Sequence, residues 1–113
     1  MNCIFCQIAR KEIPATIAYE DEHILCFKDS SPQAPVHYLV IPRLHFSDLF
    51  DADDEEMKSL GHLISRVPHI ARTLGLEKDG FRLVNNCKAK AGQSVWHFHL
   101  HLLGGRIFGW PPG

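Results

Sequence analysis

A chain of 113 residues has room for one compact domain, so we expect a single domain over residues 1–113. With 45% hydrophobic and 22% charged residues, the composition favours a packed core and excludes a disordered chain. The 12 lysines and arginines nearly balance the 13 aspartates and glutamates, which argues against a nucleic-acid binder with a basic face. No apolar run approaches the ~20 residues that cross a membrane.

The N-terminal stretch MNCIFCQIARKEIP has too short an apolar run for a secretion signal, so we expect a cytoplasmic protein. In that compartment thiols stay reduced, and a framework of disulfides is not expected. The cysteines concerned are Cys3, Cys6, Cys26 and Cys87.

The first predicted elements are a short helix and three strands. Apolar residues recur at helical spacing over residues 4–13, and this helix should end before Pro14. Residues 16–20 and 23–29 are predicted to be strands around an acidic turn. A third strand is predicted over residues 37–42, after a loop rich in turn-forming residues.

A long helix is predicted next, with Asp51 as candidate N-cap and three acidic residues in its first turn. Apolar residues recur at three and four positions from Met57 to Leu74, and Gly75 suits the helix end. Pro68 lies inside this segment, where a proline removes one helix hydrogen bond at a cost of ~3 kcal/mol, yet the apolar stripe continues in phase beyond it. We therefore predict one helix, kinked near Pro68.

The C-terminal third is predicted to hold two strands, over residues 80–86 and 94–105, separated by the loop 87–93. The tail RIFGWPPG is too rich in proline and glycine to be regular. Because strands occur in adjacent runs with short connections, we predict an α+β fold. It would contain an antiparallel sheet of about five strands, one long helix and a short N-terminal helix.

The stretch SVWHFHLHLLGG carries a histidine at every second position. Side chains alternate between the two faces of a strand, and each residue advances it by ~3.3 Å. His97, His99 and His101 should therefore share one face at intervals of ~6.6 Å. The apolar residues Phe98 and Leu100 should share the other face, under the long helix.

Three interpretations of this row remain open from the residues alone. A solvated strand face is improbable, because histidine is uncommon. Two histidines in a His-x-His pair can bind one metal ion. The third interpretation is nucleophilic catalysis, in which one imidazole attacks and its neighbours position substrate and move protons. The preceding segment AGQS offers backbone N–H groups and a hydroxyl to phosphate oxygens, if a loop or bulge turns Ser94 toward the histidines.

Cys3 and Cys6 form a C-x-x-C pair, which can give two thiolates to one tetrahedral zinc ion. A redox pair is the rival interpretation, but the pair does not lie in a thioredoxin-like βαβ context. Both cysteines could also be small residues of the core.

The motif HFHLHLL resembles the signature of the histidine triad (HIT) superfamily. The stretch GQSVWHFHLHLLGGR and the ending WPPG are similar to its Hint branch, the purine nucleoside phosphoramidases. CIFCQI, KEIPA, LVIP and the segment over residues 29–35 agree with that branch in order and spacing, so the resemblance covers essentially the whole chain. It implies a single HIT domain with a HIT-like fold, no organic cofactor, a purine nucleotide as ligand and a homodimer whose two sheets join.

The resemblance also implies an activity: hydrolysis of the P–N bond of purine nucleoside 5′-monophosphoramidates, such as AMP linked to lysine. His99 would attack phosphorus through Nε2 while its Nδ1–H donates to a backbone carbonyl. Water would then hydrolyse the nucleotidyl-histidine. The other catalytic residues implied are His101, Ser94 and His37.

Further positions match the family's binding residues. Asn86 matches a donor to the phosphate or leaving group, and Asp29 matches the carboxylate that accepts the ribose hydroxyls. The remaining matches are apolar walls around the purine, the residue before Ser94 and a C-terminal aromatic near the partner's site: Ile4, Phe5, Ile8, Gln93 and Trp110.

Some bacterial members with a cysteine pair complete a zinc site with two histidines. Those positions match His45, after the VIP strand, and His97, so the resemblance implies a structural zinc ion on Cys3, Cys6, His45 and His97. Two other functions stay open: a zinc hydrolase whose histidine row holds a metal-bound water, and a non-catalytic nucleotide-binding or scaffolding dimer.

Overall fold

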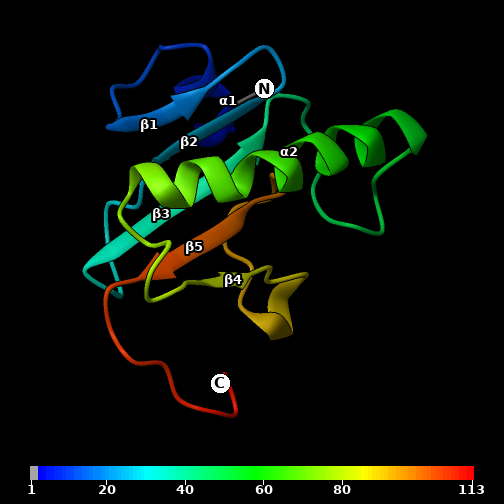
Figure 1. The fold of residues 1–113 in the computed structure, drawn as a ribbon. Helices are drawn as coiled ribbons and strands as arrows, with labels where there is room; N and C mark the ends of the chain where they lie inside the picture. The colour runs from blue at the N-terminus through cyan, green and yellow to red at the C-terminus, as the bar shows by residue number, and fades with distance from the viewer. Residues whose placement is uncertain (1–2) are drawn as a thin grey trace.

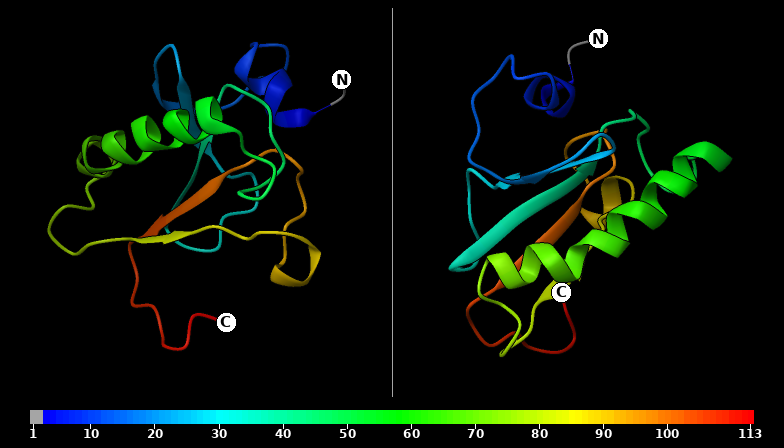
Figure 2. Two further views of the ribbon diagram at one scale, coloured as in Figure 1. Left: turned by 90° about the vertical axis from the view of Figure 1, so that its right-hand side faces the viewer. Right: turned by 45° about the horizontal axis from the view of Figure 1, so that its top comes forward.

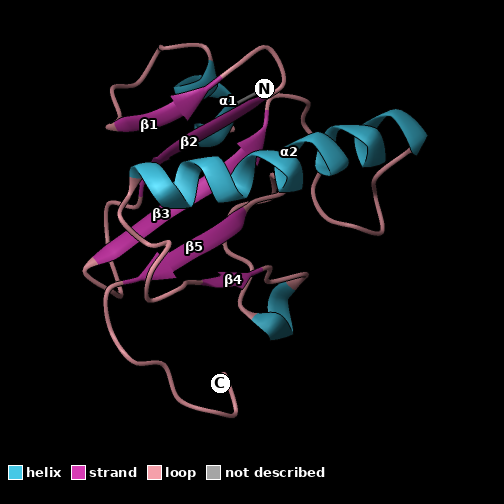
Figure 3. Cartoon of the chain, viewed as in Figure 1, coloured by secondary structure: helices cyan, strands magenta, loops and turns pink. Residues whose placement is uncertain are grey.

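The computed structural model describes residues 3–113 and contains one five-stranded antiparallel sheet in the order β1-β2-β3-β5-β4 (Figure 1). The α+β fold predicted from the sequence is therefore confirmed. Helices and loops connect the strands as Figure 3 shows. The elements in chain order are α1 (Ile4–Ala9), β1 (Ile17–Glu20), β2 (Ile24–Lys28), β3 (Val36–Pro42), α2 (Asp54–Thr73), β4 (Arg82–Val84), a 3-10 turn (Ala89–Ala91) and β5 (Leu100–Gly104).

The two helices cover opposite faces of the sheet (Figure 2). Along β2, Ile24 and Cys26 belong to the core beneath α2, whereas Leu25 and Phe27 pack with α1. This is the alternation that a strand buried on both faces requires. Both apolar layers are thus anchored on the central strands, which fixes the position of α1 beside the sheet.

The N-terminus of α2 lies two residues later than predicted. Asp53, not Asp51, is the N-cap: its carboxylate accepts the N–H of Glu56 at 2.8 Å, and the Glu56 carboxylate accepts the N–H of Asp53 at 2.8 Å. Such reciprocal pairs satisfy two free helix donors at once. Asp51 instead accepts the N–H of Ser47, which places it in the preceding loop.

The apolar stripe of α2 stays in phase through its interior proline, as predicted. Leu63, Val67 and Ile70 are all buried, whereas Pro68 is exposed. The chain leaves the helix at Gly75 with φ +77°, a conformation that glycine adopts without strain. No helix among residues 3–113 is long and apolar enough to cross a membrane.

The last strand is shorter than the predicted 94–105 because its first half is held elsewhere. Residues 95–97 form a bend, and the Phe98 N–H donates to the carbonyl of Phe46 at 2.8 Å instead of to a strand. β4 is likewise shorter than predicted, and α1 ends well before Pro14. The predicted apolar face still packs under α2: Phe98, Leu100 and Leu102.

Candidate active site

A cavity of about 810 Å³ opens between α1, the loop that follows β2 and the start of β5. One side of it is apolar, with α1 and β2 as its main walls. The other side carries imidazoles, a hydroxyl and a carboxylate. The predicted site residues that line the cavity are Ile4, Phe5, Ile8, Asp29, His37, Ser94, His99 and His101.

His99 has the tautomer and burial of a nucleophile. Its Nδ1 lies 2.8 Å from the carbonyl oxygen of His97, so Nδ1 carries the hydrogen and Nε2 keeps its lone pair. Burial lowers the pKa of His99, although the hydrogen bond to His97 acts in the opposite direction. The ring is 5% exposed and packs edge-on against Phe5, with ring centroids 5.1 Å apart. At neutral pH it is therefore a neutral base held in one orientation.

A chain of hydrogen bonds also fixes the proton on His101. The N–H of Gln33 donates to Nδ1 of His37 at 2.9 Å, so the hydrogen of neutral His37 must be on Nε2. That Nε2–H donates to Nδ1 of His101 at 2.9 Å, which leaves the hydrogen of His101 on Nε2. Burial lowers the pKa of both rings, that of His101 to about 4, and keeps them neutral.

Nothing in the sequence pointed to Gln33, because its donor is a main-chain N–H, which every residue except proline carries.

Asp29 lies beside the same chain of hydrogen bonds, with Oδ2 3.4 Å from Nε2 of His37. Its Oδ1 accepts the N–H of Ser31 at 2.7 Å, so one carboxylate oxygen is bound to its own loop. The bend at residues 95–97 matches the predicted irregularity that brings Ser94 to the cavity.

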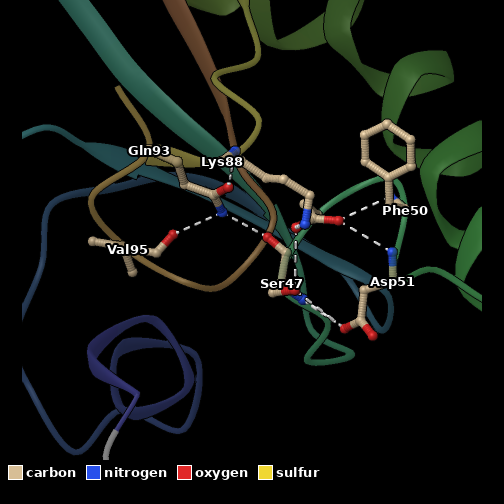
Figure 4. A network of polar contacts seen from close by, with 7 residues as sticks. Ser47, Phe50, Asp51, Lys88, Gln93 and Val95 are labelled. Atoms are coloured by element: carbon tan, nitrogen blue, oxygen red, sulfur yellow. Dashed lines mark hydrogen bonds and ion pairs between the residues drawn. The ribbon is translucent and has the colours of Figure 1, made fainter. Parts of the chain in front are cut away.

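Three predicted binding residues lie outside the cavity lining. Trp110 is 84% exposed in the irregular C-terminal tail, and Asn86 follows β4 beside Gly92. Gln93 is buried, and its carboxamide bonds to main-chain groups (Figure 4).

The four predicted metal ligands converge on one point beside α1. Nδ1 of His97 lies 3.2 Å from Nδ1 of His45, 3.4 Å from Sγ of Cys3 and 3.5 Å from Sγ of Cys6. Tetrahedral zinc with ordinary bond lengths would separate two nitrogens by about 3.3 Å and nitrogen from sulfur by about 3.6 Å. Nε2 of His97 donates to the carbonyl of Pro42 at 2.8 Å, which leaves Nδ1 free to bind a metal. These residues therefore fit a four-coordinate ion.

A second group that could hold a metal consists of Asp29, His37 and His101. Here the two imidazole nitrogens are 2.9 Å apart, which is a direct hydrogen-bond distance and shorter than the about 3.3 Å expected for two nitrogens on one ion. Nδ1 of His37 is already occupied by the Gln33 N–H. The group therefore fits proton exchange better than metal binding.

Comparison with known protein families matches the HIT domain over residues 10–107 of the chain. The chain belongs to the HIT family. Within this family it is 53% identical to a HIT-like protein of Synechocystis, over 99% of this chain and 97% of the relative. It is 46% identical to a protein of Zea mays named 14 kDa zinc-binding protein, over 97% of this chain and 87% of the relative.

The fold is also that of solved HIT structures. A HIT family hydrolase from Legionella pneumophila superposes with a TM-score of 0.94, at 48% identity, and the match covers 99% of this chain and 100% of the other. The family expected from the histidine row is thereby confirmed, together with the HIT-like fold.

Proposed function

We propose that this HIT protein is a purine nucleoside phosphoramidate hydrolase that works through a covalent nucleotidyl-histidine, as the resemblance to the Hint branch implies. The observation that carries the proposal is the pair of opposite tautomers at the cavity. His99 offers a lone pair on Nε2, and His101 offers a hydrogen on Nε2. Their ring centroids are 5.1 Å apart, so a nucleophile and a proton donor can act on the same phosphoramidate.

In the first step, Nε2 of His99 forms a bond to phosphorus while the P–N bond breaks. The bonding pair leaves with the amine nitrogen, which takes a proton from Nε2 of His101. His101 donates this proton as an imidazolium, after gaining a second proton when the anionic phosphoramidate binds, and the ring ends neutral while the nucleotidyl-imidazolium carries the positive charge. In the second step, water attacks phosphorus, returns a proton to His101 and releases AMP and free His99.

The walls of the cavity support a purine nucleotide as substrate. Ile4, Phe5 and Ile8 offer an apolar surface for a base, and Asp29 keeps one carboxylate oxygen for the ribose hydroxyls. The Ser94 hydroxyl borders the same space as His99 and can donate to a phosphoryl oxygen. Relatives named as hydrolases agree with this chemistry.

We propose that Cys3, Cys6, His45 and His97 hold a structural zinc ion, in agreement with the name of the maize relative. Zinc bound by these four residues would have all its tetrahedral positions filled by protein, as in structural sites. Such a site leaves no position for a water nucleophile, which favours the histidine mechanism over the zinc hydrolase considered above. The ion would tie α1 to the segment that carries the triad.

We infer that the protein acts as a homodimer, as the resemblance implies. β4 pairs only with β5, so its other edge is open within the described chain. The tail near it exposes large apolar side chains that a second copy could cover: Ile107 and Trp110.

Turnover of an AMP–lysine phosphoramidate by the His99→Ala variant tests the proposal. His99→Ala should release no AMP while it still binds AMP, because the cavity walls stay in place. His69→Ala is the matched control, since His69 is an exposed histidine on α2 far from the cavity lining. Substantial AMP release by His99→Ala, at the rate of the control, would rule out the nucleophile.

A further inference from the structure

Gln93 uses its whole carboxamide on three main-chain groups, as Figure 4 shows. Its Oε1 accepts the N–H of Lys88 at 2.7 Å, and its Nε2 donates to the carbonyls of Ser47 at 2.6 Å and Val95 at 3.1 Å. The residue is 6% exposed, and both amide hydrogens are used. Gln93 therefore has no free donor for a substrate, although the resemblance implied substrate binding.

The same bonds hold a strained loop. Lys88 has φ +72°, a region that residues with a side chain rarely occupy. Its N–H is held by Gln93, and its Nζ lies 3.2 Å from a carboxylate oxygen of Asp48, which is 4% exposed. That carboxylate also accepts the N–H groups of Phe50 and Asp51 at 2.9 and 3.1 Å. The network thus joins the loop after β3 to the loop before β5.

The joined loop carries a cavity residue. Ser94 lies between Gln93 and Val95, whose carbonyl is one of the three groups that Gln93 binds. Three residues after Val95, the Phe98 N–H donates to Phe46, the neighbour of Ser47. The segment from Gln93 to Phe98 is therefore hydrogen-bonded at both ends to the adjacent residues Phe46 and Ser47.

We propose that Gln93 is a positioning residue: its carboxamide fixes the backbone on either side of Ser94, so that the Ser94 hydroxyl is already aimed at the phosphoryl group before substrate binds. This inference rests on the proposed function. A donor that is fixed in advance favours the transition state, because charge grows on the phosphoryl oxygens there. Loss of the fixed position should therefore lower kcat more than it raises KM.

A double-mutant cycle tests this role. Gln93→Glu keeps the shape of the side chain but places a carboxylate oxygen against the carbonyls of Ser47 and Val95. Ser94→Ala should lower kcat by about 100-fold, as loss of one such donor does, and Gln93→Glu by about tenfold or more. If Gln93 acts through Ser94, the double variant should fall within about threefold of Ser94→Ala alone. Losses that multiply would overturn the proposal, as would an unchanged kcat in Gln93→Glu.

Gln7→Glu is the matched control, because it makes the same change at a half-buried residue of α1 outside the cavity lining. It should keep the wild-type kcat. Failure of the wild-type protein to release AMP would refute the proposed function. Failure of the positioning role alone would instead leave wild-type turnover intact and change only the results for the variants.

A measurement on the wild-type protein does not depend on activity or on the stability of a variant. In amide NMR spectra, the two side-chain N–H signals of Gln93 should be slow to exchange with water and should keep their positions when AMP is added. The backbone N–H signal of Ser94 should move in the same titration. Side-chain signals of Gln93 that shift as far as that of Ser94 would show a ligand contact and contradict the positioning role.

Discussion

At the scale of single residues, main-chain groups decide which imidazole nitrogen carries a proton. A carbonyl can only accept and an N–H can only donate, so His97 sets the tautomer of His99, and Gln33 sets that of His37. The tautomer of His37 in turn sets that of His101, because the Nε2–H of His37 donates to Nδ1 of His101. Burial keeps these rings neutral in the free protein. Two histidines thus present different groups to the cavity: His99 a lone pair on Nε2, and His101 a hydrogen on Nε2.

The role of His101 predicts a dependence on the leaving group. In His101→Ala, an alkylamine leaves without its proton donor, and kcat/KM for an AMP alkylamidate should fall by about 10²- to 10⁴-fold. A p-nitrophenyl ester of AMP needs no proton to leave, so its loss should be much smaller. Parallel measurement of kcat/KM on both substrates checks this. Equal losses on the two would show that His101 binds substrate without donating a proton.

At the scale of elements, α1 depends on tertiary contacts for its existence. It has 6 residues, far fewer than the about 12 that an isolated helix needs for marginal stability. Phe5 and Ile8 bury its inner face, and Cys3 and Cys6 belong to the group of four residues that could hold a metal ion. A wall of the cavity is therefore held by the same residues that would hold zinc.

Replacement of one metal-ligating side chain should abolish zinc binding and lower the thermal stability of the protein. Cys6→Ser should lower bound zinc from about one ion per chain to none and reduce the thermal midpoint by about 5 °C or more. Elemental analysis and calorimetry measure the two effects. Cys87→Ser is the control, since Cys87 is not among the four residues that could hold the metal ion. A wild-type protein that is purified in zinc and carries none would refute the structural ion.

Chelation separates the structural ion from a catalytic one. Well below the melting temperature, the folded protein should keep its turnover while a chelator removes zinc slowly, because no step uses the metal. Immediate loss of AMP release on chelation, with the protein still folded by circular dichroism, would favour a zinc hydrolase instead.

Asp21 connects the β1–β2 turn to α2. Its carboxylate accepts bonds from Nε2 of His62 at 2.7 Å, the hydroxyl of Tyr19 at 2.8 Å and the backbone N–H of His23 at 2.7 Å. Burial alone would raise the pKa of Asp21, but these donors outweigh it and hold the pKa far below its usual range. The folded state therefore favours the ionised carboxylate.

The depressed pKa predicts how acid affects stability. Asp21→Asn should cost about 1.5–3 kcal/mol at neutral pH, the range for hydrogen bonds to a charged group. Below about pH 4 the unfolded chain binds a proton at Asp21 while the folded one does not, so this stabilisation fades as the pH falls. Urea unfolding of both proteins from pH 7 to pH 3 should show the gap closing. A gap that stays constant would contradict the assignment.

At the scale of the whole molecule, the open edge of β4 and the exposed tail predict association. Sedimentation at micromolar concentration should give the mass of two chains, and the triad variant His99→Ala should behave in the same way. A single-chain mass across the concentration range would contradict the proposed homodimer.

The sequence predicted the fold because local patterns carried it. Turn-forming residues between apolar runs marked β2 and β3, and the stripe from Met57 to Leu74 marked α2 despite Pro68. The errors arose where long-range bonds override local preference. The Phe46 carbonyl shortens the last strand, and a reciprocal bond moves the helix cap to Asp53. For the same reason, the donor at Gln33 and the engagement of Gln93 with main-chain groups could not be read from residue types.

The most direct test of the central claim is the mass of the protein during turnover. We would mix wild-type protein with an AMP–lysine phosphoramidate, quench it in alkaline denaturant within one turnover, and map the product by mass spectrometry. We expect one AMP moiety bound to His99, with none on His97 or His101. Complete turnover with no nucleotidylated protein at any time, or an adduct on another residue, would contradict it.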